Sequence, residues 1–97
     1  MPRRMNNDTR ELIEQVTAAL KAAGAREVYV FGSAATGDLR PDSDLDLAVS
    51  GLPPHRFFGV VGHLHQLASR AVDLVDLDAA TPFTRYLREE ESLVRVG

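Results

Sequence analysis

The sequence contains no cysteine, and this absence removes two classes of site at once. Without thiols the chain can form neither disulfide bonds nor thiolate metal sites. It also has no apolar run near the roughly 20 residues that a membrane-spanning helix needs, and no apolar stretch follows its charged start as one would in a secretory signal. We therefore expect a cytoplasmic protein that does not bind membranes.

Clustered positive charge is also missing. The net charge is −3, and the 11 lysine and arginine residues are scattered along the chain. Because broad nucleic-acid binding needs a basic patch, we expect no general nucleic-acid binding. The 97 residues fit one domain, spanning residues 1–97.

Hydrophobic periodicity predicts helices and strands in alternation. Helices are expected at about 8–23, 55–70 and 82–90, and strands at 27–31, 44–49, 72–77 and 93–96. The second helix is expected to have one apolar face, formed by Phe58, Val61, Leu64, Leu67 and Ala68. The first two strands can pair antiparallel, so we expect an α/β (α+β) fold with a small mixed sheet flanked by helices, packed on one side. Edge pairing through 93–96 would allow a homodimer.

Aspartates interrupt two of these apolar strands. Asp44 and Asp46 are two residues apart, so their side chains share one face of a strand. Their mutual repulsion is relieved by a cation such as magnesium, which prefers hard oxygen ligands. If the third strand lies beside the second, Asp73 can join the pair, and three carboxylates make a site for two divalent ions. The alternatives are a solvated strand face for the pair, and a strand-end acid or buried ion pair for Asp73.

Gly32-Ser33 directly follows the first strand. Glycine lets the backbone approach a ligand closely, and N–H groups exposed in such turns bind phosphate. A tight strand-to-helix turn uses the same residues, so the pair alone does not decide between the two interpretations. The pattern is neither a P-loop nor a dinucleotide fingerprint, and it has no P-loop lysine. Metal would therefore have to meet most of the phosphate charge.

Together, Gly32-Ser33, ten intervening residues and Asp44-Leu45-Asp46 form a G-S-x10-D-x-D signature. The stretch FGSAATGDLRPDSDLDL closely resembles the minimal nucleotidyltransferases of the DNA polymerase β-like superfamily. The resemblance covers most of the chain and implies the polymerase β palm-like nucleotidyltransferase fold. It also implies that Gly32 and Ser33 bind the phosphates of the nucleotide. Asp44, Asp46 and Asp73 would be the catalytic residues that bind two Mg²⁺ ions, with Asp76 as the fallback for the third carboxylate.

The resemblance further implies a reaction. An acceptor hydroxyl attacks the α-phosphorus of ATP or another NTP, pyrophosphate leaves, and a nucleoside monophosphate, AMP in the simplest case, is transferred. Arg40 and Ser43, in the loop between the two motifs, are further nucleotide-binding candidates. For Arg40 a solvated loop arginine is the alternative.

Larger members of the family that the chain resembles hold the acceptor in an extra domain, and we expect no such domain in these 97 residues. Short family members resemble antitoxins encoded beside helical HEPN toxins, and some attach AMP to their toxin. This implies a magnesium-dependent protein adenylyltransferase of a toxin–antitoxin system with a HEPN-type partner. Two alternatives remain: a non-catalytic antitoxin that neutralises the toxin by contact, and a metal-dependent phosphohydrolase or sugar-nucleotide transferase.

Overall fold

The computed structural model describes residues 7–40, 42–90 and 93–97. Its elements follow in the order α1 (Asn7–Ala22), β1 (Glu27–Phe31), α2 (Ser33–Thr36), β2 (Leu45–Ser50), a 3-10 turn (Pro54–Arg56), α3 (Phe57–Ala68), β3 (Val72–Asp76), α4 (Pro82–Glu89) and β4 (Val94–Arg95). The predicted order is confirmed except for α2, which has only four residues and is too short for hydrophobic periodicity to reveal. In these described ranges no helix is long and apolar enough to cross a membrane.

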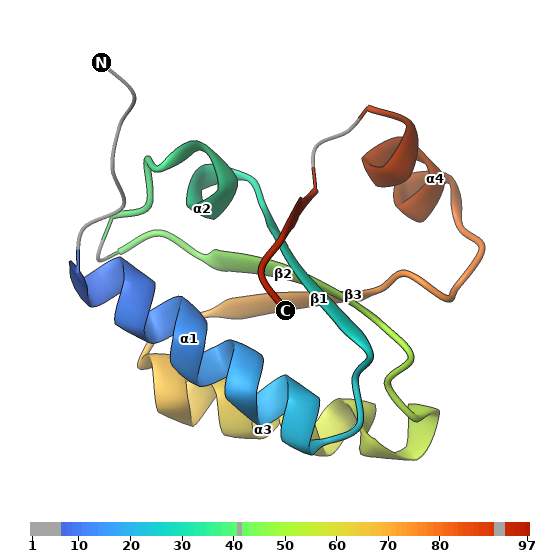
Figure 1. The fold of residues 1–97 in the computed structure, drawn as a ribbon, viewed down its shortest axis with the longest axis horizontal. Coiled ribbons are helices and arrows are strands. Elements are labelled where there is room, and N and C mark those ends of the chain that lie inside the picture. The colour runs from blue at the N-terminus through green and yellow to red at the C-terminus, as the bar shows by residue number, and fades with distance from the viewer. Residues whose placement is uncertain (1–6, 41, 91–92) are drawn as a thin grey trace.

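The four strands form one mixed sheet in the order β3-β2-β1-β4. β1 pairs antiparallel with both β2 and β4, whereas β2 and β3 run parallel. The antiparallel pairing of the first two strands and the mixed sheet were both predicted. The parallel pair needs a crossover connection, and α3 provides it by passing beneath the sheet (Figure 1).

Helices α1 and α3 cover one face of the sheet (Figure 1). Strand side chains alternate between faces, so every second residue of β1 and β2 points toward these helices. The resulting core includes Val28, Val30, Leu45, Leu47 and Val49 from the strands, with Val16, Leu20 and Leu64 from the helices. All eight side chains are fully buried, so this face of the sheet forms the main hydrophobic core.

The expectation that all helices pack on one side was wrong. Leu87 of α4 is buried in a second apolar cluster with Ala48 and Leu77, on the opposite face from Leu47 and Val49. The sequence hid this face because Ala48 is small and lies within the continuous apolar run Leu47-Ala-Val49, which gives no clear alternation. Helix α4 therefore covers part of the face from which the side chains of Asp46 and Asp73 project.

The expected inward face of α3 was also partly wrong. Val60, Leu64 and Ala68 are its buried residues, at a spacing of four, while Phe58 is 86% exposed. The helical period is satisfied by either set over a short stretch, because glycines at 59 and 62 leave few large side chains to define a stripe. Phe58 instead makes an edge-to-face contact with Phe57.

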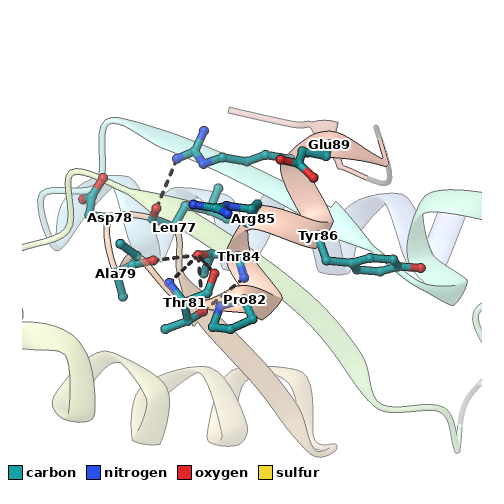
Figure 2. Close-up of a pocket in the computed structure, with 11 residues that line it drawn as sticks. Leu77, Asp78, Ala79, Thr81, Pro82, Thr84, Arg85, Tyr86 and Glu89 are labelled. Atoms are coloured by element: carbon teal, nitrogen blue, oxygen red, sulfur yellow. Dashed lines mark hydrogen bonds between the residues drawn. The ribbon is translucent and has the colours of Figure 1, made fainter.

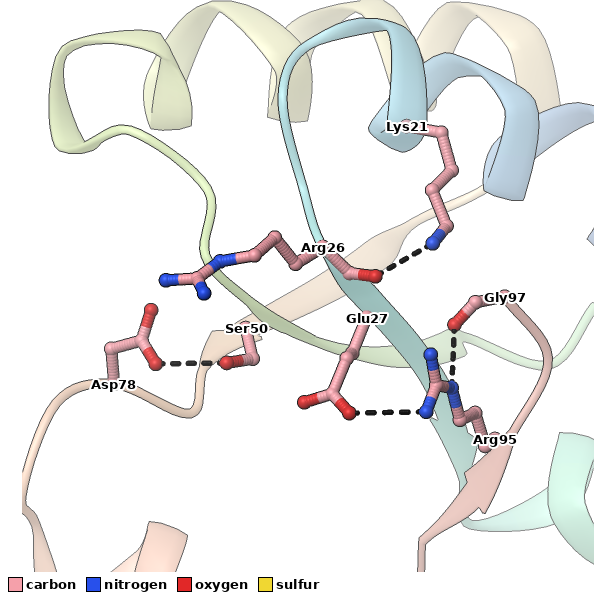
Figure 3. Close-up of polar contacts among 7 residues, drawn as sticks. All are labelled: Lys21, Arg26, Glu27, Ser50, Asp78, Arg95 and Gly97. Atoms are coloured by element: carbon pink, nitrogen blue, oxygen red, sulfur yellow. Dashed lines mark hydrogen bonds and ion pairs between the residues drawn. The ribbon is translucent and has the colours of Figure 1, made fainter.

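Polar contacts stabilise one end of the sheet (Figure 3). Asp78 accepts hydrogen bonds from the Ser50 hydroxyl at 2.9 Å and from the Gly51 backbone N–H at 2.7 Å. The Gly51 N–H is the main reason that the pKa of Asp78 is lowered. Arg95 forms an ion pair with Glu27 at 3.2 Å. These contacts join the start of β1, the end of β2, the turn after β3 and strand β4 at one end of the sheet. Asp46 lies toward the other end, where it pairs with Phe31, the last residue of β1.

Candidate active site

Asp46 of β2 and Asp73 of β3 are directly paired neighbours in the sheet, and we call this pair the acidic rung. The parallel register of β2 and β3 pairs their Cα atoms directly, so both side chains project from the face opposite to Leu45 and Leu47. Parallel strands that run in register place directly paired side chains close together. The structure thus places the third carboxylate candidate beside one member of the D-x-D pair.

The electrostatics of Asp46 reflect this crowding. Its pKa is raised above the ordinary value of 3.8, first by partial burial, then by the negative charge of Asp73 and a side-chain hydrogen bond with it, and last by Asp44. All of these causes favour the neutral form of the carboxyl group. A bound cation would reverse the balance, so the donor set of this rung fits a hard divalent ion such as Mg²⁺.

Asp44 is less firmly placed than the other two. It is exposed and precedes Leu45, the first residue of β2, so neither burial nor strand pairing dictates where its carboxylate points. Across the described ranges, no three His, Cys, Asp or Glu side chains are gathered closely enough to hold a metal ion. The expected convergence of three carboxylates is therefore partial: two share a rung, and Asp44 adds its charge from the strand entry.

Gly32 lies directly against the carboxylate of Asp46. It has φ +63°, and a Cβ atom built at this position would collide with Oδ2 of Asp46. Both the positive φ and the close approach exclude a side chain here. Ser33 begins α2, and the carbonyl of Gly32 accepts hydrogen bonds from the N–H groups of Ala35 and Thr36. The G-S turn and the acidic rung are therefore one site.

Arg40 and Ser43 form a tight turn in the loop that leads to Asp44. The Ser43 hydroxyl accepts a hydrogen bond from the Arg40 backbone N–H at 3.1 Å, and the Ser43 N–H donates to the Arg40 carbonyl at 3.0 Å. The Ser43 side chain thus orders the loop. Arg40 itself is exposed, as its alternative interpretation as a solvated loop residue allows.

Sequence reasoning missed Arg70, which connects this loop to β3. Its Nη1 donates to the carbonyls of Arg40 at 2.9 Å and Ser43 at 3.3 Å. The neighbouring Ala71 carbonyl accepts the N–H of Leu45 at 2.9 Å. Arg70 therefore holds the entry to β2 against the strand that carries Asp73. Nothing in the sequence distinguishes it from the other arginines, because its partners lie 27 and 30 residues away.

Replacing Arg70 with alanine should loosen the strand entry without unfolding the protein. Hydrogen bonds from a charged donor contribute about 1.5–3 kcal/mol, and part of this is lost because the carbonyls can bind water instead. We expect faster hydrogen exchange at the amide of Leu45 and a lower free energy of unfolding. Arg70→Lys should restore part of both, and Arg10→Ala, an exposed change on α1, should alter neither. Unchanged exchange at Leu45 in Arg70→Ala would contradict the assignment.

Asp76 is not part of the acidic rung. It pairs with Val49 in the register, three residues beyond Asp73 and thus on the other face. Its Oδ1 accepts a hydrogen bond from the backbone N–H of Asp78 at 2.9 Å. This contact orders the turn after β3, so Asp73 is the residue whose position suits a third carboxylate.

A cavity of about 760 Å³ lies beside α4, but none of the three carboxylates lines it. Its walls are formed by residues from Leu77 to Glu89 (Figure 2). The wall is ordered by a capping box, in which Thr81 and Thr84 each accept the other's backbone N–H at 3.1 Å. Thr84 also donates to the carbonyl of Ala79 at 2.7 Å. The cavity is thus formed by α4 and the turn before it, and it is separate from the acidic rung.

Comparison with known proteins places this geometry in a family. The family described as polymerase beta, nucleotidyltransferase matches residues 14–94, which includes the G-S turn and all three aspartates. None of the curated protein sequences compared with the chain matches it.

Solved structures show the same fold. A protein assigned as a minimal nucleotidyltransferase is 29% identical, with a TM-score of 0.70 over 91% of this chain and 95% of that one. A chain of a toxin–antitoxin structure with AMP-PNP is 23% identical, with a TM-score of 0.69 over 84% of this chain and 69% of that one. A chain from a complex of a tri-AMPylated Shewanella oneidensis HEPN toxin with its MNT antitoxin is 20% identical, with a TM-score of 0.67 over 90% and 70%.

Proposed function

Since the chain belongs to the polymerase β nucleotidyltransferase family, we propose that it transfers AMP from ATP to a hydroxyl group of a partner protein. The observation that supports this most directly is the acidic rung: Asp46 beside Asp73, with Gly32 against the Asp46 carboxylate. A nucleotide whose phosphates lie at the turn would have its reacting phosphorus next to both carboxylates.

Each residue has a part in this proposal. Asp46 and Asp73, with Asp44 at the strand entry, would hold Mg²⁺. When bound, magnesium lowers the pKa of the attacking hydroxyl and neutralises charge on the leaving pyrophosphate. Gly32 leaves the backbone open to the phosphates, and the Ser33 hydroxyl can donate to them. Asp73 is exposed, so an acceptor hydroxyl can reach its carboxylate.

The transfer itself is an in-line displacement. The acceptor oxygen forms a bond to the α-phosphorus of ATP, the bond from that phosphorus to the bridging oxygen breaks, and pyrophosphate leaves. The hydroxyl proton passes to the carboxylate of Asp73 as the new bond forms. Positioning and charge stabilisation supply most of the rate in such reactions, and the acidic rung and the G-S turn are suited to both.

The partner class is proposed from the similar structures. The antitoxin in the Shewanella oneidensis complex is seen with a tri-AMPylated HEPN toxin, and another similar structure is a toxin–antitoxin with AMP-PNP. Helix α4 covers only part of the acidic face of the sheet. A separate protein could therefore present a hydroxyl to Asp73 from the solvent side, and we propose a helical HEPN-type toxin for this role.

The test is transfer of α-phosphate label from ATP onto the product of the neighbouring reading frame, for which we expect a helical protein. We expect label on that protein, together with one pyrophosphate released per AMP transferred. Inorganic phosphate as the product would instead indicate a hydrolase. A wild-type chain that transfers no label, while Asp44→Ala still neutralises the toxin, would indicate a non-catalytic binding module.

A further inference from the structure

Two aromatic side chains on α4 are exposed to solvent, although burial of such large apolar surfaces is favourable. Phe83 is 48% exposed and Tyr86 56% exposed. They are three residues apart and therefore neighbours on one side of the helix. Thr84 and Leu87 are buried against the sheet and the turn before the helix, and Leu87, four residues after Phe83, adjoins it on the helix surface. The helix is thus anchored through Thr84 and Leu87, with Phe83 at the border of the buried side and Tyr86 farther toward solvent.

The position of Phe83 connects this aromatic side to the candidate active site. The ring of Phe83 meets the ring of Phe31 edge-on, with centroids 6.1 Å apart and planes at 68°. Phe31 is the last residue of β1, its Cα pairs with that of Asp46, and it directly precedes Gly32. One ring contact therefore separates Phe83 from the residue that adjoins both the G-S turn and the acidic rung.

Tyr86 lies on the same side of α4 as Phe83 and is among the residues that line the cavity. Figure 2 shows its ring extending away from Arg85 and Thr84, which line the cavity wall. Phe83 is not among the residues that line that cavity. In a nucleotide, one sugar joins the base to the α-phosphate. A nucleotide bound at the turn would therefore carry its base only a short distance from the turn, comparable with the separation between the rings of Phe31 and Phe83.

We propose that Phe83 is the stacking platform for the nucleobase of the bound triphosphate, with Tyr86 extending the platform. This rests on the proposed nucleotidyl transfer at the same site. Stacking on an aromatic face needs no hydrogen-bond pattern, since every base has a π-face. The platform thus gives affinity for the nucleoside part of the substrate, and larger purines gain more from it than pyrimidines do.

The test compares two ligands that share phosphates and differ in the base. Binding of Mg²⁺-ATP and of Mg²⁺-tripolyphosphate is measured by calorimetry for the wild type, Phe83→Ala, Phe83→Leu and Phe58→Ala. Phe83→Leu keeps an apolar contact with Phe31 and so guards against loss of the fold. Phe58 is a matched control, because it is an exposed phenylalanine in an edge-to-face pair on α3, the layer beneath the sheet.

We expect Phe83→Ala and Phe83→Leu to weaken ATP binding by roughly 5- to 150-fold, the range that base stacking supplies, and to leave tripolyphosphate binding unchanged. Phe58→Ala should change neither. Tripolyphosphate binding as tight as ATP binding in the wild type would overturn the platform and leave the proposed transfer standing. A change in transfer to the partner by Phe83→Leu, with ATP binding unchanged, would also overturn the platform, because Phe83 would then contact the partner protein and not the base. A wild type that binds neither ligand would overturn both proposals.

Discussion

Replacing Asp46 with asparagine is expected to reduce AMP transfer by at least about 10²–10³-fold, the scale of losing one electrostatic contact to the transition state. Asp46 is central to the candidate site because it shares a rung with Asp73 and lies against Gly32. Asparagine preserves the shape of the side chain but lacks the charge that binds a divalent cation. Labelled transfer from ATP to the partner measures the loss.

The same substitution should stabilise the magnesium-free protein at neutral pH. The pKa of Asp46 is raised in the folded state, so over the interval between its ordinary and raised values the folded chain holds more protons than the unfolded chain. Stability is then greatest below the ordinary pKa and falls as the pH rises through the raised one. Asp46→Asn removes this fall. A gain of about 0.2–1 kcal/mol is expected, as for other exposed charge interactions.

Thermal unfolding with chelator across pH measures this gain, which should vanish in acid. Magnesium should make the wild type more stable than Asp46→Asn. At 100 times the dissociation constant, a bound ligand stabilises the folded protein by about 2.7 kcal/mol, and magnesium should do little for Asp46→Asn. The matched control is Asp76→Asn on the opposite face of β3, which should retain transfer, because the amide oxygen of asparagine can still accept the N–H of Asp78. If Asp76→Asn is the inactive variant, the assignment of the acidic rung is wrong.

Replacing Gly32 with alanine is the second change with a large expected effect. The backbone of Gly32 has φ 63° and ψ −141°, a sparsely populated conformation that costs an L-residue about 1–3 kcal/mol, and the new Cβ would collide with Oδ2 of Asp46. The turn and the carboxylate must therefore move apart. Because a displacement of about 1 Å can cost roughly 10²-fold in rate, transfer should fall by at least that factor. ATP binding should weaken as well, since the turn is the proposed phosphate site.

Gly62→Ala is the matched control for this prediction and should have the opposite effect on stability. Gly62 is exposed on α3, and a Cβ there meets no atom within 4 Å. Alanine in a helix interior is favoured over glycine by roughly 0.5–1 kcal/mol, so the melting temperature should rise while transfer is unchanged. If Gly32→Ala loses stability as expected but retains transfer, the turn has no part in the reaction.

The accuracy of the sequence-based predictions depended on how local each feature is. The D-x-D spacing placed Asp44 and Asp46 on one strand face because side-chain alternation is a property of consecutive residues. It could not choose between Asp73 and Asp76. Side-chain alternation places these two residues on opposite faces of their strand, but it does not tell which face lies beside Asp46. The parallel register of β2 and β3 makes the choice by pairing Asp73 with Asp46. Arg70 was missed for the same reason, since its hydrogen-bond partners are far away in sequence.

Local patterns in the sequence were sufficient for the strands, the G-S turn, the spacing of the aspartates and the family to which these belong. They act between neighbouring residues, through backbone preference and side-chain alternation. Tertiary packing decided which face α4 covers, which carboxylate joins Asp46, and which aromatic ring lies near the site. These depend on contacts between segments distant in sequence, whose pairing is fixed only when the apolar faces of the sheet are buried together.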